Sequence, residues 1–162
     1  LMIDRIPIEG SDRELVLVNL HLEAYDDGEG KAAQTEMLRQ ILQDEVDAGN
    51  YVIAGGDFNQ SFSNVDISMY PVISDDLWEP GTIDVGAFGD DLKFETDNRT
   101  PSCRSLDQSY EGADWKNFQY YLIDGFIVSS NLTVNSVETR DLGFQNSDHN
   151  PVVMKVTLDS DR

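Results

Sequence analysis

Apolar residues occur in short runs separated by polar loops, and the first two runs predict a β-hairpin. Residues 2–8 alternate loosely between apolar and polar positions, and residues 15–22 read LVLVNLHL. The polar segment EGSD at 9–12 has the composition of a turn. The second run is apolar at consecutive positions, which is typical of a central strand covered on both faces.

A predicted amphipathic helix separates this hairpin from the next strand. Residues 31–48 carry apolar side chains at helical spacing, and Gly49 is suited to ending the helix. The run YVIAGG at 51–56 then predicts a strand. Strand, helix and strand joined by short connections favour an α/β layer arrangement.

The middle of the chain, residues 61–117, shows little periodicity because proline, glycine and aspartate interrupt it. So long an irregular region is unusual unless it is functional or contains short elements. Its aromatic side chains could line a substrate groove, but we expect most of them to pack the region onto the sheet: Trp78, Phe88, Phe94, Tyr110 and Trp115.

Regular patterns return in the last third of the chain. The run FQYYLIDGFIVS at 118–129 predicts a strand that Asp124 interrupts, and residues 133–140 and 151–158 predict two more. The residues after Asp159 have the composition of a solvated tail.

Size and composition indicate one folded domain. With 162 residues, 40% of them hydrophobic, the chain is long enough to bury a core. No apolar run is long enough to cross a membrane, and no signal peptide is recognisable. Because the chain begins with Leu1 and Met2, its start need not be a natural N-terminus, so the compartment stays open between cytoplasmic and secreted.

The strongest global feature is negative charge. The chain has 11 basic and 31 acidic residues, a net charge of −20. Nucleic-acid binding normally depends on Lys and Arg neutralising phosphates, and the sequence has no basic cluster. Unless divalent cations screen the contact, this balance favours a small phosphorylated substrate or a polar headgroup over a long duplex. The alternative is that the acidity only maintains solubility.

The single cysteine, Cys103, excludes an internal disulfide. Cysteine-based metal sites need several thiolates or a neighbouring histidine, and no histidine stands near Cys103 in the sequence. We therefore expect Cys103 to be a small buried apolar side chain.

Polar side chains stand where the predicted strands end. Asp57 and Asn59 follow the strand at 51–56, and strand alternation would place both on the same face. Asn19 and His21 form a similar pair at the end of the second strand. Ligands and catalytic groups of α/β sheets gather at such ends, although Asp and Asn are also common in turns.

Both histidines of the chain lie in this setting. His149 precedes the last predicted strand beside Asp148, and His21 ends the second one. Each polar residue taken alone indicates no more than a cap or a turn, but together they indicate a site.

Four motifs occur in one order: NLHL at 19–22, GGDFN at 55–59, ID at 123–124 and SDHNPV at 147–152. With these motifs the chain resembles the second half of the endonuclease/exonuclease/phosphatase superfamily, which includes pancreatic deoxyribonuclease, apurinic endonucleases, sphingomyelinases and inositol polyphosphate 5-phosphatases. The resemblance implies an α/β (α+β) fold, part of a four-layer αββα sandwich, with a mixed, mostly antiparallel sheet and a flanking helix.

The resemblance also implies roles for the matched residues. Asp57 would activate or position the attacking water near a metal ion, and Asn59 would hold the phosphate. His149, oriented by Asp124, would hydrogen-bond a phosphate oxygen or transfer a proton. Asp148 would be a metal ligand.

Three further residues complete the expected site. His21 would face the leaving group as a candidate general acid, and Asn19 would support the same pocket. A plainer interpretation is that His21 caps backbone groups and that Asn19 bonds a neighbouring loop. Arg104, one of the few basic residues of the long irregular region, is our candidate for a phosphate contact.

The chemistry agrees with these assignments. Phosphodiester hydrolysis needs an in-line water, neutralisation of the phosphoryl oxygens and a protonated leaving group. Mg²⁺ or Mn²⁺ held by carboxylate and water oxygens would stabilise the developing charge. We therefore expect a divalent-metal-dependent phosphoesterase that acts on a phosphodiester or phosphomonoester in a phosphorylated small molecule, a lipid headgroup or a nucleic acid.

The sequence departs from the superfamily in one respect. The first half of these proteins supplies a metal-binding glutamate, which cannot be placed here because Glu9 and Glu14 only flank a turn. We therefore expect this chain alone to bind Mg²⁺ weakly and to catalyse poorly. The sheet face that would pack on the missing N-terminal half would be exposed, so we expect a homodimer or pairing with that half.

Two other functions stay open. A non-catalytic domain could retain the fold and bind a partner; the absent glutamate favours this, and the intact set of matched residues opposes it. Calcium binding by YDDGE at 25–29 is disfavoured because the segment lacks the alternating ligand spacing of a calcium loop.

Overall fold

The structure of the chain, a computed structural model, describes residues 1–25, 29–111, 113–114 and 116–159. Trp115, the centre of the YDDGE loop and the tail after Asp159 therefore lie outside the described residues.

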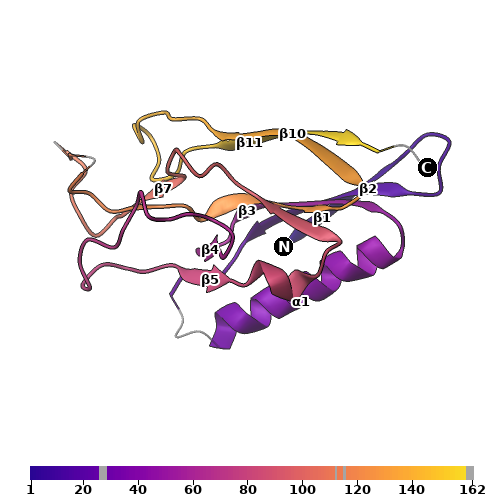
Figure 1. The fold of residues 1–162 in the computed structure, drawn as a ribbon, viewed down its shortest axis with the longest axis horizontal. Coiled ribbons are helices and arrows are strands. Elements are labelled where there is room, and N and C mark those ends of the chain that lie inside the picture. Colours follow the sequence, from indigo (N-terminus) through magenta and orange to yellow (C-terminus); the bar gives the residue numbers. More distant parts are fainter. Residues whose placement is uncertain (26–28, 112, 115, 160–162) are drawn as a thin grey trace.

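A five-stranded sheet forms the centre of the fold (Figure 1). Its strands, in spatial order, are β1 (Met2–Pro7), β2 (Glu14–His21), β3 (Tyr51–Asp57), β9 (Asp124–Ser129) and β6 (Leu92–Glu95). β1 and β2 form the predicted hairpin, β2 and β3 run parallel, and the other neighbours are antiparallel. The mixed, mostly antiparallel sheet and the α+β class are thus confirmed.

Helix α1 (Glu29–Asp47) connects the two parallel strands and covers one face of the sheet (Figure 1). Its Leu38 and Leu42 are fully buried against the apolar side chains of β2 and β3. Gly49 ends the helix as predicted: it adopts φ 82°, and its N–H donates to the Val46 carbonyl at 2.8 Å. None of the described helices has the length and apolarity needed to cross a bilayer.

A second, two-stranded sheet covers the opposite face. β10 (Leu132–Thr139) and β11 (Val152–Leu158) pair antiparallel above the central sheet (Figure 1). Leu132 packs against Tyr51 and Val128 of the central sheet. The central strands are therefore covered on both faces, as the apolar run at 15–22 predicts, and helix, sheet and small sheet form three successive layers. No helix of the described residues covers the outside of β10 and β11.

The irregular region contains short elements that its composition conceals. They are β4 (Gln60–Phe62), β5 (Gly81–Ile83), the 3-10 helix η1 (Val85–Phe88) and β7 (Cys103–Arg104), in addition to β6. β4 and β5 pair in parallel. Strands of two to four residues are too short to show a period in the sequence, which is why the region seems patternless by sequence alone.

Aromatic side chains attach this region to the rest of the molecule. Phe88 and Phe94 meet edge to face at 4.8 Å within the helix-side core, which confirms the packing prediction for these two. Trp78 packs edge-on against Tyr121, with ring centroids 5.0 Å apart. Tyr110 belongs to a separate aromatic cluster of the loops.

The single strand predicted over residues 118–129 is wrong. The structure divides it into β8 (Tyr120–Tyr121), which pairs with β7, and β9, which pairs with β3. The break arises because the N–H groups of Ile123 and Asp124 both donate to the Ser102 hydroxyl at 3.1 Å. Asp124 therefore begins a strand rather than interrupting one.

Gly56 gives a test of how closely the two parallel strands approach each other. Its φ is 146°, and a Cβ atom there would lie 2.0 Å from the Leu20 carbonyl oxygen. We expect Gly56→Ala to lower the free energy of unfolding, measured by urea denaturation, by several times the effect of Gly10→Ala. Gly10 shares the positive φ but has open space around it, so its substitution should cost about 1–2 kcal/mol. Equal effects of the two substitutions would contradict the close approach.

Candidate active site

Three of the predicted site residues occupy one edge of the central sheet. The register aligns His21 of β2 with Asp57 of β3, and Asp57 with Asp124 of β9. Because β2 and β3 are parallel, both end at this edge. β9 runs antiparallel to β3, so its first residue lies at the same edge. The sheet therefore places an imidazole and two carboxylates side by side.

His149 approaches this edge from the loop before β11 and lies between the two carboxylates. Its Nδ1 is 2.9 Å from Asp124 Oδ2, and its Nε2 is 3.7 Å from Asp57 Oδ2. The hydrogen bond to Asp124, helped by a contact with Cys103, raises the pKa of His149 to about 11 against the effect of burial. The imidazole is therefore charged at neutral pH, with Nδ1–H donated to Asp124.

The environment of Asp57 differs because burial raises the pKa of its carboxyl group. The Asn59 N–H donates to Asp57 Oδ1 at 2.8 Å, and the positive charge of His149 also opposes that rise. Desolvation makes Asp57 a stronger proton acceptor than an exposed aspartate.

Asn59 reaches the site through a turn and not through strand alternation. β3 ends at Asp57, and Asn59 adopts φ 49°. Its Nδ2 donates to the Leu22 carbonyl at 2.9 Å and lies 3.2 Å from Asp57 Oδ2. The prediction that Asp57 and Asn59 lie together is confirmed, but the reason given for it is wrong. The two interpretations of this pair, a turn and a polar site, therefore both apply: the turn after β3 brings Asn59 to the site.

The loop around β7 holds the SDHN motif in place. The Arg104 N–H donates to the Asp148 carbonyl at 2.9 Å, and the Asn150 N–H donates to the Ser102 carbonyl at 2.8 Å. Cys103 and His149 form an isolated antiparallel bridge. Backbone hydrogen bonds thus set the positions of Asp148 and His149.

Sequence reasoning missed Ser102 and Asn150, both of which are buried. Ser102 fixes the backbone at Asp124, and Asn150 donates to the Pro101 carbonyl and accepts from the Leu142 N–H. Asn150 lies inside the SDHNPV motif, so its position was a usable signal, whereas a lone serine in an irregular region offers none.

A cavity opens over this edge of the sheet. Its lining includes six of the predicted residues, namely His21, Asp57, Asn59, Arg104, Asp148 and His149, together with Trp78, Cys103 and Tyr121. The Trp78 indole N–H donates to the Ala24 carbonyl at 2.8 Å, and its carbonyl accepts from the Tyr121 hydroxyl at 2.6 Å.

Three predicted residues lie at the margins of this cavity. The side chain of His21 is 75% exposed, and its Nε2 is 3.7 Å from Asp57 Oδ2, which puts it at the rim. Asp124 stands behind His149 and lines a second hollow on the other side. Asn19 is exposed on β2 and does not line the cavity, so its role stays a prediction.

The oxygen atoms at this cavity suit a hard divalent cation. Asp57 and Asp148 offer carboxylate oxygens, and Asn59 adds an amide. Mg²⁺ is commonly held by one or two carboxylates, several waters and the phosphate of the substrate. The residues present fit such an ion.

Asp124→Asn tests the charge on His149. A neutral amide removes the carboxylate that stabilises the imidazolium, so we expect the pKa of His149 to fall from about 11 toward the ordinary 6.5. An NMR titration of the imidazole C–H signal measures this, and a His21→Ala background leaves a single histidine. Asp12→Asn, in the exposed β1–β2 turn, is the control. A wild-type pKa near 6.5 would contradict the assignment.

The Asp124–His149 pair should also make the free energy of unfolding fall as the pH rises. Because folding raises the pKa of His149, its contribution to the free energy of unfolding is full below pH 6.5 and is lost as the pH rises toward 11. Urea denaturation at several pH values should show this loss in the wild type and a smaller one in Asp124→Asn.

Solved structures show where this fold occurs among known proteins. No profile of a known protein family matches the chain, and the sequence of no curated protein does. A conserved protein of unknown function from Enterococcus faecalis V583 is 16% identical, with a TM-score of 0.54 over 93% of this chain and 53% of that one. Two structures of TDP2 from Caenorhabditis elegans are also 16% identical, with TM-scores of 0.50 over 94% of this chain and 48% and 49% of theirs.

The chain therefore spans about half the length of the solved structures it matches. At 16% identity the likeness concerns the fold alone. TDP2 is a member of the endonuclease/exonuclease/phosphatase superfamily. The fold of this chain is distantly similar to the fold of that superfamily.

Proposed function

We propose that the chain carries the catalytic edge of a divalent-metal-dependent phosphoesterase. The observation that carries the proposal is His149, hydrogen-bonded to Asp124 at 2.9 Å and 3.7 Å from Asp57 in one cavity. A histidine oriented by one carboxylate beside a second, partly buried carboxylate is suited to proton transfer at a phosphate.

Each group would act at a stated atom. His149 is charged and would donate from Nε2 to a phosphoryl oxygen, while Asp57 would accept a proton from the attacking water. The Asn59 amide would hold the phosphate, as the superfamily resemblance implies. His21, at the rim 3.7 Å from Asp57, would protonate a leaving group that extends toward solvent.

Asp148 would hold Mg²⁺ or Mn²⁺, with Asp57 beside the attacking water near the ion. The ion, when bound, supplies positive charge to the phosphoryl oxygens. Arg104 is the proposed phosphate contact. Its guanidinium lies 4.7 Å from the centre of the Tyr110 ring and donates to the Ser105 carbonyl, while its buried Nε has no acceptor among the described residues. The position of Arg104 in the cavity lining supports a role in binding an anion.

The charge distribution supports a small substrate. Arg104 is the one arginine or lysine among the lining residues of the cavity, and the chain as a whole carries −20. A long duplex would place many phosphates against this acidic surface. A phosphorylated small molecule or a lipid headgroup brings one or two, so these classes are favoured over nucleic acid.

The proposed enzyme would be completed by a further segment of polypeptide. β1 is an edge strand, and its Arg5 forms an ion pair with Glu45 of α1, so Met2 and Ile6 face the side of β10 and β11. They are 59% and 45% exposed. The small sheet thus leaves part of this face uncovered, which supports the prediction of a homodimer or of pairing with a missing N-terminal half.

Hydrolysis of bis(p-nitrophenyl) phosphate tests the activity. We expect slow hydrolysis with Mg²⁺ or Mn²⁺, loss of hydrolysis with EDTA, and a rate about 10²- to 10⁴-fold lower in His149→Ala. Asp12→Asn, remote from the cavity, should keep the wild-type rate. Metal-dependent hydrolysis that survives His149→Ala would contradict the proposed role. A chain inactive with either metal, alone and after association with a second half, would favour a non-catalytic binding domain.

Sedimentation velocity tests the association. We expect self-association of the chain at high concentration, and monomers for the double variant Met2→Ser, Ile6→Ser. Ile67→Ser is the matched control because Ile67 is 47% exposed but lies in the long loop region. A wild-type chain that stays monomeric would contradict the homodimer and leave pairing with another segment as the remaining proposal.

A further inference from the structure

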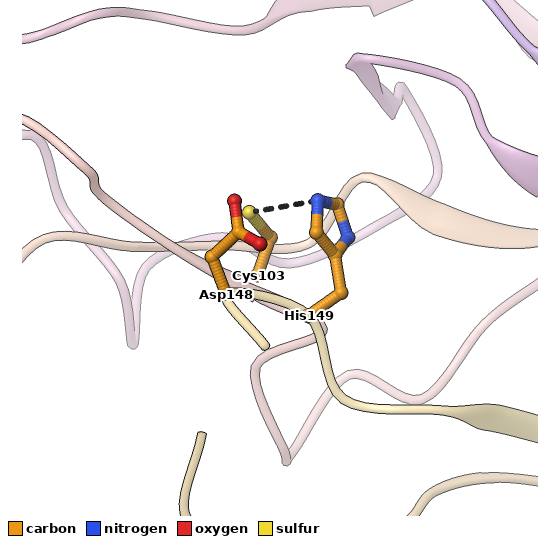
Figure 2. A group of neighbouring side chains, drawn as sticks. All are labelled: Cys103, Asp148 and His149. Atoms are coloured by element: carbon orange, nitrogen blue, oxygen red, sulfur yellow. Dashed lines mark hydrogen bonds between the residues drawn. The ribbon is translucent and has the colours of Figure 1, made fainter. Parts of the chain in front are cut away.

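The cavity contains a second set of potential ligands, which differs in chemistry from the oxygen atoms assigned to Mg²⁺. Figure 2 shows Cys103, Asp148 and His149 converging on one point. One ligand atom from each, a sulfur, a carboxylate oxygen and an imidazole nitrogen, lie within 4.8 Å of one another. A thiolate and an imidazole are ligands that Zn²⁺ favours and Mg²⁺ does not. The sequence-based argument against a cysteine-based metal site relied on the absence of a histidine near Cys103 in the sequence, and folding brings His149 to within 3.5 Å of its sulfur.

The orientation of His149 suits such an ion. Its Nδ1 is engaged by Asp124, which leaves Nε2 directed at Cys103 Sγ, 3.5 Å away. Zinc-binding histidines almost always give their other ring N–H to a carboxylate or carbonyl, because this fixes the tautomer and the ring. Asp124 already supplies that partner.

The backbone holds the three ligands together. Cys103 and His149 face each other across the isolated bridge, and the N–H of Arg104, the next residue, donates to the carbonyl of Asp148. Movement of the side chains, with the backbone kept in place, would then bring the ligand atoms to coordination distance. All three side chains line the cavity, so an ion can reach them from solvent. The Asp57 carboxylate, 3.7 Å from His149 Nε2, or a water molecule can occupy a fourth position.

We propose that Cys103, Asp148 and His149 form a Zn²⁺ site that overlaps the phosphoesterase site and inhibits it. On binding, the thiol proton and the Nε2 proton of His149 leave to solvent, and the ion takes their places. His149 then cannot donate to a phosphoryl oxygen, and Asp148 is no longer free for Mg²⁺. The inhibition rests on the proposed function, whereas the Zn²⁺ site itself does not.

Cobalt absorption tests the site without any substrate. Co²⁺ substitutes for Zn²⁺ and, when bound to a thiolate, gives a near-ultraviolet charge-transfer band. Cys103 is the one cysteine of the chain, so a band can arise from no other residue. We expect the band in the wild type, its displacement by Zn²⁺, its absence in Cys103→Ser, and Zn²⁺ affinity at least about tenfold lower in that variant. Asp107→Asn, a carboxylate of the same cavity outside the cluster, should keep the band.

Two results would overturn the site: no band in the wild-type chain, or Zn²⁺ affinity in Cys103→Ser equal to that of the wild type. Circular dichroism identifies a misfolded variant, and the wild-type band decides the question even then.

Inhibition is measured separately. In the assay with Mg²⁺, Zn²⁺ should inhibit the wild type, whereas Cys103→Ser, compared with its own rate without Zn²⁺, should resist Zn²⁺. Hydrolysis insensitive to Zn²⁺ despite a cobalt band would overturn the overlap. A chain that hydrolyses nothing fails the proposed function, while the cobalt band still decides the Zn²⁺ site.

Discussion

The hydrogen bond between Asp124 and His149 is the interaction on which the whole site depends. It joins a loop residue to the edge of the central sheet across 25 positions of sequence. Asp124 can make it because the Ser102 hydroxyl fixes its backbone, and His149 can because the SDHN segment is bonded to β7. Removing this bond would leave a partly buried carboxylate without its partner and an imidazole without a fixed orientation, which costs more than the bond alone contributes.

The same arrangement would let the proposed Mg²⁺ and Zn²⁺ sites share one cavity. Asp57 and Asp148 face it with oxygen atoms, whereas Cys103 and His149 add sulfur and nitrogen. The net charge of −20 favours cation binding, and the softness of the ligand atoms then determines which cation the cavity prefers. In this proposal Mg²⁺ or Mn²⁺ supports hydrolysis, and Zn²⁺ prevents it.

Much of this could be predicted from the sequence, for identifiable reasons. The apolar pattern predicts β1, β2, α1 and β3 because each is long enough to show a period. The motifs predict which residues meet at the sheet edge, because each motif stands at the end of a strand. The register then aligns His21 with Asp57 and Asp57 with Asp124. Elements of two to four residues carry no such signal, so β4 to β8 and the division at Asp124 could not be foreseen. Cys103 illustrates the limit best: its partner His149 is 46 positions away, and only the β7 pairing reveals it.

Trp78 has a consequence for how the site can be studied. Its indole N–H donates to the Ala24 carbonyl, its backbone carbonyl accepts from the Tyr121 hydroxyl, and the residue forms part of the cavity wall. A rigid indole beside a site of changing charge is an internal fluorophore. In a Trp115→Phe background, which leaves Trp78 as the one tryptophan of the chain, its emission would report the arrival of an ion or a phosphate, so occupancy of the cavity can be followed with no label and no turnover.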